Sequence, residues 1–339
     1  MKIAHIILTH SFAGSERHAI ELANMQADTG HDVTVVLHKR GTENRDNAII
    51  QHIADNISVK VIDGSRLFAS RRARQVIREI EPDVAHAHLS AACKALKGLS
   101  GKCLRIATLH IHYKPQQHRH LDALIAIAPW QLEAIPSALK KNSAQIDNWS
   151  QAVPASKDAR EQLRAQYGIA NDEIVFGTLG RVVDSKGHET LIEAFHLADV
   201  PNSRLVIVGD GKNWKAIREK AESSIVMPGF SNKPHDWLAC FDVFVSAAKS
   251  EPFGLVFLEA MHAQLPIVSS ASHGAQYLKS YFPYPLSDIG NAEQLAEIMQ
   301  QAAKNTSPVD YDMESFHPDA KCNEVIQFYQ QQLQRIRQQ

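Results

Sequence analysis

The sequence predicts an α/β protein of two domains, each built on a parallel β-sheet. Three observations support this prediction. The chain has 339 residues, 44% of them hydrophobic, which suffices for two domains of ordinary size with a core in each. In both halves, short apolar segments rich in β-branched residues alternate with segments of helical spacing. The pattern breaks at Pro154 and then restarts, so we place the hinge near residue 150, between domains spanning residues 1–150 and 151–320.

In the first half, apolar segments followed by polar turns predict the strands. These segments are residues 2–8, 33–37, 59–62, 83–88, 105–110 and 121–128. After the first strand, Ala19, Ile20, Leu22 and Ala23 repeat at helical spacing. They predict a helix that ends at Gly30, and with the strand at residues 33–37 it completes a βαβ unit. Further helices are expected at residues 66–78 and 130–139.

The second half repeats this organisation. Its predicted strands are residues 173–180, 204–211, 225–230, 241–246 and 265–270. Helices are expected at residues 188–197, directly after Pro252, and at 292–303 and 323–337, whereas residues 272–275 are predicted to form a loop.

Composition excludes several classes of protein. The formal net charge is −1, so there is no global basic field of the kind that favours nucleic acid. The four cysteines are far apart and form no C-x2-C pair, as expected for reduced thiols in a cytosolic protein. The first residues are too polar for a signal peptide, and no stretch reaches the roughly 18 apolar residues of a membrane helix. A cytoplasmic location is expected.

Residues 251–261, Glu-Pro-Phe-Gly-Leu-Val-Phe-Leu-Glu-Ala-Met, form the most informative stretch of the chain. A buried strand precedes it, and helical spacing begins after Pro252. Gly254 allows close approach of a ligand, and the unpaired N–H groups of Leu255 and Val256 at the helix start would bind an anion such as phosphate. Glu251 and Glu259 flank this position, where one carboxylate can face a sugar and the other the hydroxyls of a ribose. The alternative is an amphipathic helix whose glutamates are only solvated.

Glu251 and Glu259, with Pro-Phe-Gly-Leu between them, resemble the E-x7-E motif of the retaining glycosyltransferases of family 4. The resemblance covers nearly the whole chain and is densest over residues 177–268. It implies the GT-B fold, in which two Rossmann-like domains face a cleft, and transfer from a nucleoside diphosphate sugar with retention of the anomeric configuration. It also implies that the helix at residues 323–337 packs back on the first domain.

Other stretches resemble further elements of that family. Gly180-Arg181 followed by Lys186-Gly187 resembles its Gly-Arg…Lys-Gly element, and these two cations suit a diphosphate. Thr108-Leu109-His110 resembles a strand end whose histidine lies by the donor sugar. Ala13-Gly14 stands where the family has two glycines, which leaves Gly14 as the candidate phosphate contact.

The implied roles divide between two groups of residues. His110 and Glu251 are the implied catalytic residues. The implied nucleotide-sugar contacts are Gly14, Arg181, Lys186, Phe230, Phe253, Gly254, Leu255, Val256 and Glu259.

No metal or cofactor is expected beyond the UDP-, GDP- or ADP-sugar donor. The chain has 18 histidines, and His86 and His88 fall at a strand end, but no H-E-x-x-H pattern accompanies them. Arg181, Lys186 and the helix start already supply positive potential for the leaving diphosphate.

The segment from Arg66 to Arg78 carries five arginines on a predicted helix. It is interpreted either as a solvated face or as peripheral contact with an anionic membrane or acceptor.

The sequence therefore predicts a retaining glycosyltransferase acting on a glycan or glycolipid acceptor. A nucleotide-sugar epimerase of GT-B fold and a non-catalytic nucleotide-sugar-binding subunit are the alternatives. The absence of a G-x-G-x-x-G element followed by a ribose-binding acid argues against a nicotinamide enzyme.

Overall fold

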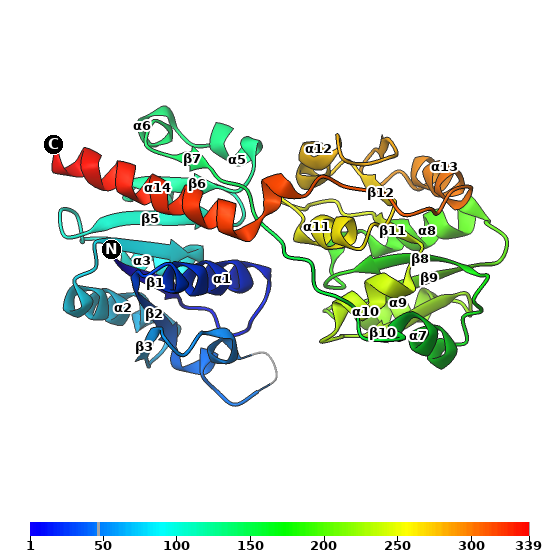
Figure 1. The fold of residues 1–339 in the computed structure, drawn as a ribbon, viewed down its shortest axis with the longest axis horizontal. Coiled ribbons are helices and arrows are strands. Elements are labelled where there is room, and N and C mark those ends of the chain that lie inside the picture. The colour runs from blue at the N-terminus through cyan, green and yellow to red at the C-terminus, as the bar shows by residue number, and fades with distance from the viewer. Residues whose placement is uncertain (46–47, 339) are drawn as a thin grey trace. The chain divides into compact units, whose positions relative to one another are not determined.

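The structure is a computed structural model that describes residues 1–45 and 48–338. The chain divides into two compact units, shown in Figure 1. The first comprises Met1–Asn148 and Pro318–Gln339, and the second comprises Trp149–His317. Each unit is a parallel sheet with helices on its faces, so the predicted α/β fold class is confirmed.

The first unit is built on a seven-stranded parallel sheet in the order β3-β2-β1-β4-β5-β6-β7. Its strands are β1 (Lys2–Ile7), β2 (Asp32–His38), β3 (Ser58–Ile62), β4 (Val84–His88), β5 (Leu104–Leu109), β6 (Ala123–Ala126) and β7 (Ala144–Gln145). Strands β1 and β4 are central and pair in register, with His5 opposite His86. Both of their faces are covered, so their apolar residues are almost completely buried.

Helices cover the two faces of this sheet. On one face α2 (Arg66–Ile80) and α3 (Leu89–Ala95) pack over Ala4 and Ile6. On the other face α1 (Gly14–Asp28) packs over Ile7, Val35 and Leu37. The remaining helical segments of the unit are α4 (Pro115–His118), α5 (Pro129–Glu133), α6 (Ser137–Lys140), η1 (Lys39–Gly41) and η2 (Ile49–His52).

The C-terminal helix α14 (Pro318–Arg337) belongs to the first unit, where it contacts α1 and β5 (Figure 1). It begins at Pro318 rather than at residue 323, because proline is well tolerated in the first turn of a helix. Its Tyr329 is fully buried, and the phenol oxygen lies 2.6 Å from His86 Nδ1. The last helix is thus fixed to the central strand of the first sheet.

The second unit contains a six-stranded parallel sheet in the order β10-β9-β8-β11-β12-β13. Its strands are β8 (Ile174–Leu179), β9 (Ser203–Val208), β10 (Ile225–Gly229), β11 (Val243–Ser246), β12 (Ile267–Ser270) and β13 (Leu286–Ser287). Its helices are α7 (Ala159–Tyr167), α8 (His188–Ala198), α9 (Trp214–Lys220), α10 (Pro234–Cys240), α11 (Leu255–His262), α12 (His273–Leu278) and α13 (Ala292–Ala303), with 3-10 turns η3 (Asp184–Lys186) and η4 (Glu314–Phe316).

Several elements of the structure differ from the prediction. The helix predicted at residues 130–139 is divided into α5 and α6, since Pro136 cannot donate to a helical hydrogen bond. The loop predicted at residues 272–275 begins helix α12, which Ser272 caps by accepting a hydrogen bond from the Ala275 N–H. The short edge strands β7 and β13 were not predicted, because two residues are too few to show alternation.

A buried arginine joins α7 to the sheet of the second unit. Arg164 is 1% exposed and donates hydrogen bonds to the backbone carbonyls of Glu173 and Cys240. Its Nη2 also lies 2.6 Å from an Asp242 carboxylate oxygen, which accepts from the Val175 N–H as well. Because a buried guanidinium is costly unless its donors are satisfied, this network holds the helix in one position.

Helix α2 carries the arginines of the segment from Arg66 to Arg78. Within the described side chains, which exclude that of Arg66, Arg72 donates to the Asp63 carbonyl and Arg74 donates to the Lys94 and Ala95 carbonyls. These two arginines therefore have structural partners, whereas Arg71 and Arg78 are exposed. Over the described part of the chain, neither α2 nor any other helix has the length and apolar character needed to cross a membrane.

Candidate functional site

Most of the predicted site residues of the second unit follow the carboxyl ends of its central strands. In a parallel sheet these ends lie on one edge, which is where ligands bind in open α/β folds. Strand β8 leads to Gly180 and Arg181, and β11 leads to Glu251. Strands β8 and β11 are hydrogen-bonded neighbours, so these two loops are adjacent.

Glycines allow the loops at this edge to approach one another closely. Gly187 has φ +67°, and a Cβ there would collide with the Ala247 carbonyl oxygen after β11. Gly209 has φ +140°, and a Cβ there would collide with the Gly180 carbonyl oxygen. Only glycine fits such positions without displacing backbone, so the edge is compact and its geometry is fixed.

Lys186 and Glu251 form an ion pair across this edge. Their side chains are 21% and 14% exposed, so water screens the pair only partly. Sequence analysis predicted both residues separately, and the structure joins them. Arg181 is exposed, and within the described part of the chain its guanidinium has no recorded hydrogen bond or ion pair. Among the described residues, Arg181 is thus an uncompensated cation five positions before the paired Lys186.

Helix α11 begins at this edge with unpaired backbone donors. Its N-cap Gly254 has φ 93° and ψ 65°, and no side chain caps the helix. The Gly254 carbonyl accepts from the Phe257 N–H at 2.9 Å, and no acceptor is recorded among the described residues for the N–H groups of Leu255 and Val256. A Cβ on Gly254 would collide with the Phe257 ring. The arrangement is that of an anion site at a helix N-terminus.

The other predicted residues of the second unit differ in accessibility. Glu259 is half-buried on α11, one turn after Leu255. Phe230 is 70% exposed directly after β10. Phe253 is 1% exposed and packs against the rings of Tyr277 and Phe316, so the predicted nucleotide-sugar contact could come only from its backbone.

In the first unit, Gly14 is the exposed first residue of helix α1. Ala13 precedes it as the N-cap, with φ −144° and ψ −175°. This is extended backbone that any residue adopts, so alanine in place of glycine imposes no strain on the turn.

His110 directly follows β5 and is half-buried. Its Nε2 lies 3.2 Å from Nδ1 of the buried His88. Burial lowers the pKa of His110 to about 4, so the imidazole is neutral at pH 7 and can donate one hydrogen bond and accept another.

Sequence analysis assigned no role to the glycines that shape the carboxyl edge of the sheet in the second unit. Gly187, Gly209 and Gly274 each bring two loops together, and a Cβ on Gly274 would collide with the Phe253 carbonyl oxygen.

Comparison with known proteins identifies the family. The model described as Glycosyltransferase Family 4 matches residues 12–176, and the model described as Glycosyl transferases group 1 matches residues 159–314. The lipopolysaccharide core biosynthesis glycosyltransferase LpsE of Rhizobium meliloti is 25% identical over 318 residues, which cover 91% of this chain and 90% of that protein. The alpha-monoglucosyldiacylglycerol synthase of Acholeplasma laidlawii is 27% identical over 294 residues, and the alignment covers 70% of this chain and 72% of that protein.

Solved structures share the fold. Anabaena Alr3699/HepE, crystallised in complex with UDP-glucose, aligns with a TM-score of 0.75 at 21% identity over 100% of both chains. WaaG, a glycosyltransferase involved in lipopolysaccharide biosynthesis, aligns with a TM-score of 0.68 at 17% identity over 97% of this chain and 95% of its own. The GT-B fold is confirmed, and the chain belongs to the family 4 type of glycosyltransferases with a group 1 domain in its second half.

Proposed function

We propose that this glycosyltransferase transfers a sugar from a nucleoside diphosphate sugar to a glycan or glycolipid acceptor, with retention of the anomeric configuration. The observation that carries the proposal is the set of positive groups at the edge of the second unit's sheet, where the carboxyl ends of its strands lie. Arg181 and Lys186 follow β8, and α11 begins after the neighbouring strand β11, which supports a shared region of positive potential there. A departing diphosphate develops negative charge, which such fixed donors stabilise more strongly than they stabilise the neutral part of the donor.

The relatives support the substrate class. LpsE is named for lipopolysaccharide core biosynthesis, and the Acholeplasma enzyme is named for the synthesis of a glycolipid, monoglucosyldiacylglycerol. HepE was crystallised in complex with UDP-glucose. We accordingly favour a UDP-sugar as donor, with Glu259 accepting hydrogen bonds from the ribose, and Glu251 and His110 orienting the sugar. The unstrained Ala13 removes the main reason for favouring a non-catalytic binding subunit.

A thermal-shift screen against UDP-, GDP- and ADP-sugars tests the proposal. A donor at a hundred times its dissociation constant stabilises the folded protein by about 2.7 kcal/mol, which a melting curve resolves easily. Stabilisation by a UDP-sugar, with slow release of UDP when acceptor is absent, is the expected result. No stabilisation by any of the three donors would overturn it.

Transfer should persist in EDTA. The diphosphate charge is met here by Arg181, by Lys186 and by backbone N–H groups, and these side chains need no metal to act. Initial rates with and without EDTA measure this, and the two should agree within about twofold. Loss of transfer in EDTA with rescue by magnesium or manganese would show that a cation performs the role given to these groups.

We also propose peripheral contact of α2 with the cytoplasmic face of an anionic membrane. Changing the exposed Arg71 and Arg78 to Ser should weaken binding to liposomes containing phosphatidylserine by about 1 kcal/mol per arginine, more so at low salt. A matched control removes the same charge from the second unit by changing the exposed Lys157 and Lys304 to Ser. Equal cosedimentation of the two double variants would mean that α2 is only a solvated helix.

A further inference from the structure

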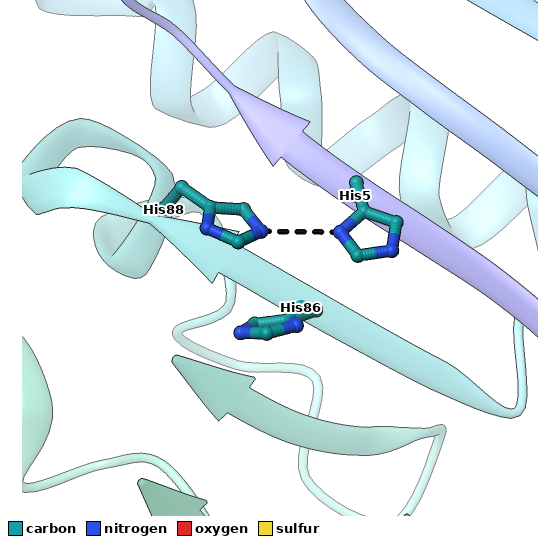
Figure 2. A group of neighbouring side chains, drawn as sticks. All are labelled: His5, His86 and His88. Atoms are coloured by element: carbon teal, nitrogen blue, oxygen red, sulfur yellow. Dashed lines mark hydrogen bonds between the residues drawn. The ribbon is translucent and has the colours of Figure 1, made fainter. Parts of the chain in front are cut away.

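Five histidines gather in the first unit on the sheet face that α1 and α14 cover. His5 comes from β1, His86 and His88 from β4, His18 from α1, and His110 follows β5. His5 and His86 are paired across the strands, and His88 is two residues further on the same face. Figure 2 shows His5, His86 and His88 together, and all three are at most 1% exposed. So many buried imidazoles need partners.

Three of these histidines, His5, His88 and His110, are linked into one hydrogen-bonded row within the first unit. Gln26 Oε1 lies 2.8 Å from His5 Nε2, and His5 Nδ1 lies 3.1 Å from His88 Nε2, the contact dashed in Figure 2. His88 Nδ1 in turn lies 3.2 Å from His110 Nε2. The neighbouring His86 is bonded separately, with the Tyr329 phenol oxygen 2.6 Å from its Nδ1 and the Thr108 hydroxyl 2.8 Å from its Nε2. The row thus connects a buried glutamine to the histidine expected at the donor sugar.

Every ring in this row is neutral at physiological pH. Burial lowers the pKa of His5 to about 4, although the bond to Gln26 opposes the shift. Burial, with a smaller effect of the neighbouring histidines, also lowers the pKa values of His86 and His88 well below 6.5. A neutral imidazole has one donor nitrogen and one acceptor nitrogen. The direction of one bond in the row therefore fixes the direction of all the others.

The Gln26 side chain sets that direction. Its carbonyl oxygen is the atom beside His5, so His5 carries its proton on Nε2 and accepts on Nδ1. Burial raises the pKa of Tyr329, and the Gln26 side chain works against that rise. The amide nitrogen has no hydrogen-bond partner among the described residues, so the orientation of the amide is assigned from its oxygen at His5 alone.

Starting from Gln26 and His5, the position of each ring proton along the row follows from the one before it. His88 must donate from Nε2 to His5, so its Nδ1 accepts from the Nε2–H of His110. His110 is then left with an unprotonated Nδ1, and the rings of His18 and His110 lie nearly perpendicular with centroids 5.1 Å apart. We propose that Gln26, His5 and His88 are positioning residues that hold His110 in the Nε2–H tautomer, so that Nδ1 accepts a hydrogen bond from a hydroxyl of the donor sugar. This rests on the proposed function in placing the sugar at His110.

A divalent cation held by His5, His86 and His88 is the competing explanation, because their ligand nitrogens all lie within 4.8 Å of one another. It would need lone pairs on both His5 Nδ1 and His88 Nε2. His88 would then carry its proton on Nδ1 and donate to His110, which reverses the tautomer of His110. It would also take one His86 nitrogen from Tyr329 or Thr108. We favour the hydrogen-bonded row because both nitrogens of each of the three rings already have a partner in the protein.

Two-bond proton–nitrogen correlation spectra of the 15N-histidine-labelled protein at pH 7 decide between the two. The His110 signals are identified by their loss in His110→Asn. The expected result is an Nε2–H tautomer for His5, His88 and His110 without added metal and with zinc added. An Nδ1–H tautomer of His110, or one zinc bound per chain by mass spectrometry of the metal content, would overturn the proposal. This measurement uses the wild-type protein and needs no sugar.

Two variants of His88 connect the row to turnover. His88→Asn keeps an acceptor oxygen near the position of Nδ1, so it should preserve the His110 tautomer and most of the turnover. His88→Phe offers no acceptor, so His110 should populate both tautomers and kcat should fall about tenfold with little change in UDP affinity. If both variants lower kcat equally, the row does not act through the tautomer. If the tautomers are as expected but His110→Asn leaves kcat unchanged, the placement of the sugar fails while the row stands.

Discussion

Replacing Lys186 with Met is expected to lower the turnover of the sugar donor by about 10²- to 10³-fold, with little change in melting temperature. Lys186 is one of only a few groups that can neutralise the leaving diphosphate, and losses of this size follow removal of one such preorganised donor. The variant also leaves the Glu251 carboxylate, only 14% exposed, without its cation. An unpaired negative charge beside the diphosphate would raise the barrier further.

The matched control is Lys304→Met, since Lys304 is an exposed lysine of the same unit that follows helix α13. It removes the same charge from the unit and should retain turnover within about twofold. Steady-state rates of UDP release with an excess of donor compare the two variants. Wild-type turnover in Lys186→Met would remove this lysine from the proposed mechanism.

Replacing Arg164 with Met should lower the free energy of unfolding of the second unit by about 3 to 5 kcal/mol, the cost of breaking a buried ion pair by removing one partner. Arg164 is 1% exposed and satisfies several carbonyl groups together with Asp242. Without it, the Glu173 carbonyl loses its side-chain donor, and Asp242 keeps only the Val175 N–H and the partly exposed Arg160. Urea denaturation followed by circular dichroism measures the loss.

Arg160 provides the comparison, because it binds the other oxygen of the same Asp242 carboxylate but is 37% exposed. Water can replace much of its contact, so Arg160→Met should cost clearly less than Arg164→Met. Equal losses from the two variants would mean that burial does not determine the strength of this network.

Much of the fold could be predicted from the sequence because strands of a parallel sheet are buried on both faces and form continuous apolar segments. Residues 83–88 and 105–110 were placed within one residue of β4 and β5 for this reason. The helix predicted at residues 130–139 is broken at Pro136, because proline lacks the N–H group that the interior of a helix requires. The two-residue edge strands were missed because their pairing depends on neighbouring strands rather than on their own pattern.

The site was predictable only in part. Glu251, Glu259 and Gly254 lie in one stretch with recognisable spacing, so the helix start could be read directly from the sequence. The ion pair between Lys186 and Glu251 could not be read, since it joins loops 65 residues apart that meet only because β8 pairs with β11. The histidine row could not be predicted either, since His5, His88 and His110 come from three strands or strand ends that meet only in the folded sheet.

The central claim is that α11 and Glu259 hold the nucleotide of the donor while Glu251 acts on its sugar. Calorimetry with UDP alone tests this in the two variants Glu259→Ala and Glu251→Ala. Loss of a charge-assisted contact of about 1.5 to 3 kcal/mol should weaken UDP binding roughly ten- to a hundredfold in Glu259→Ala. In Glu251→Ala the affinity for UDP should not fall, because Lys186 is released from its ion pair, whereas turnover of the sugar donor should. Wild-type UDP affinity in both variants would contradict the assignment of the paired glutamates.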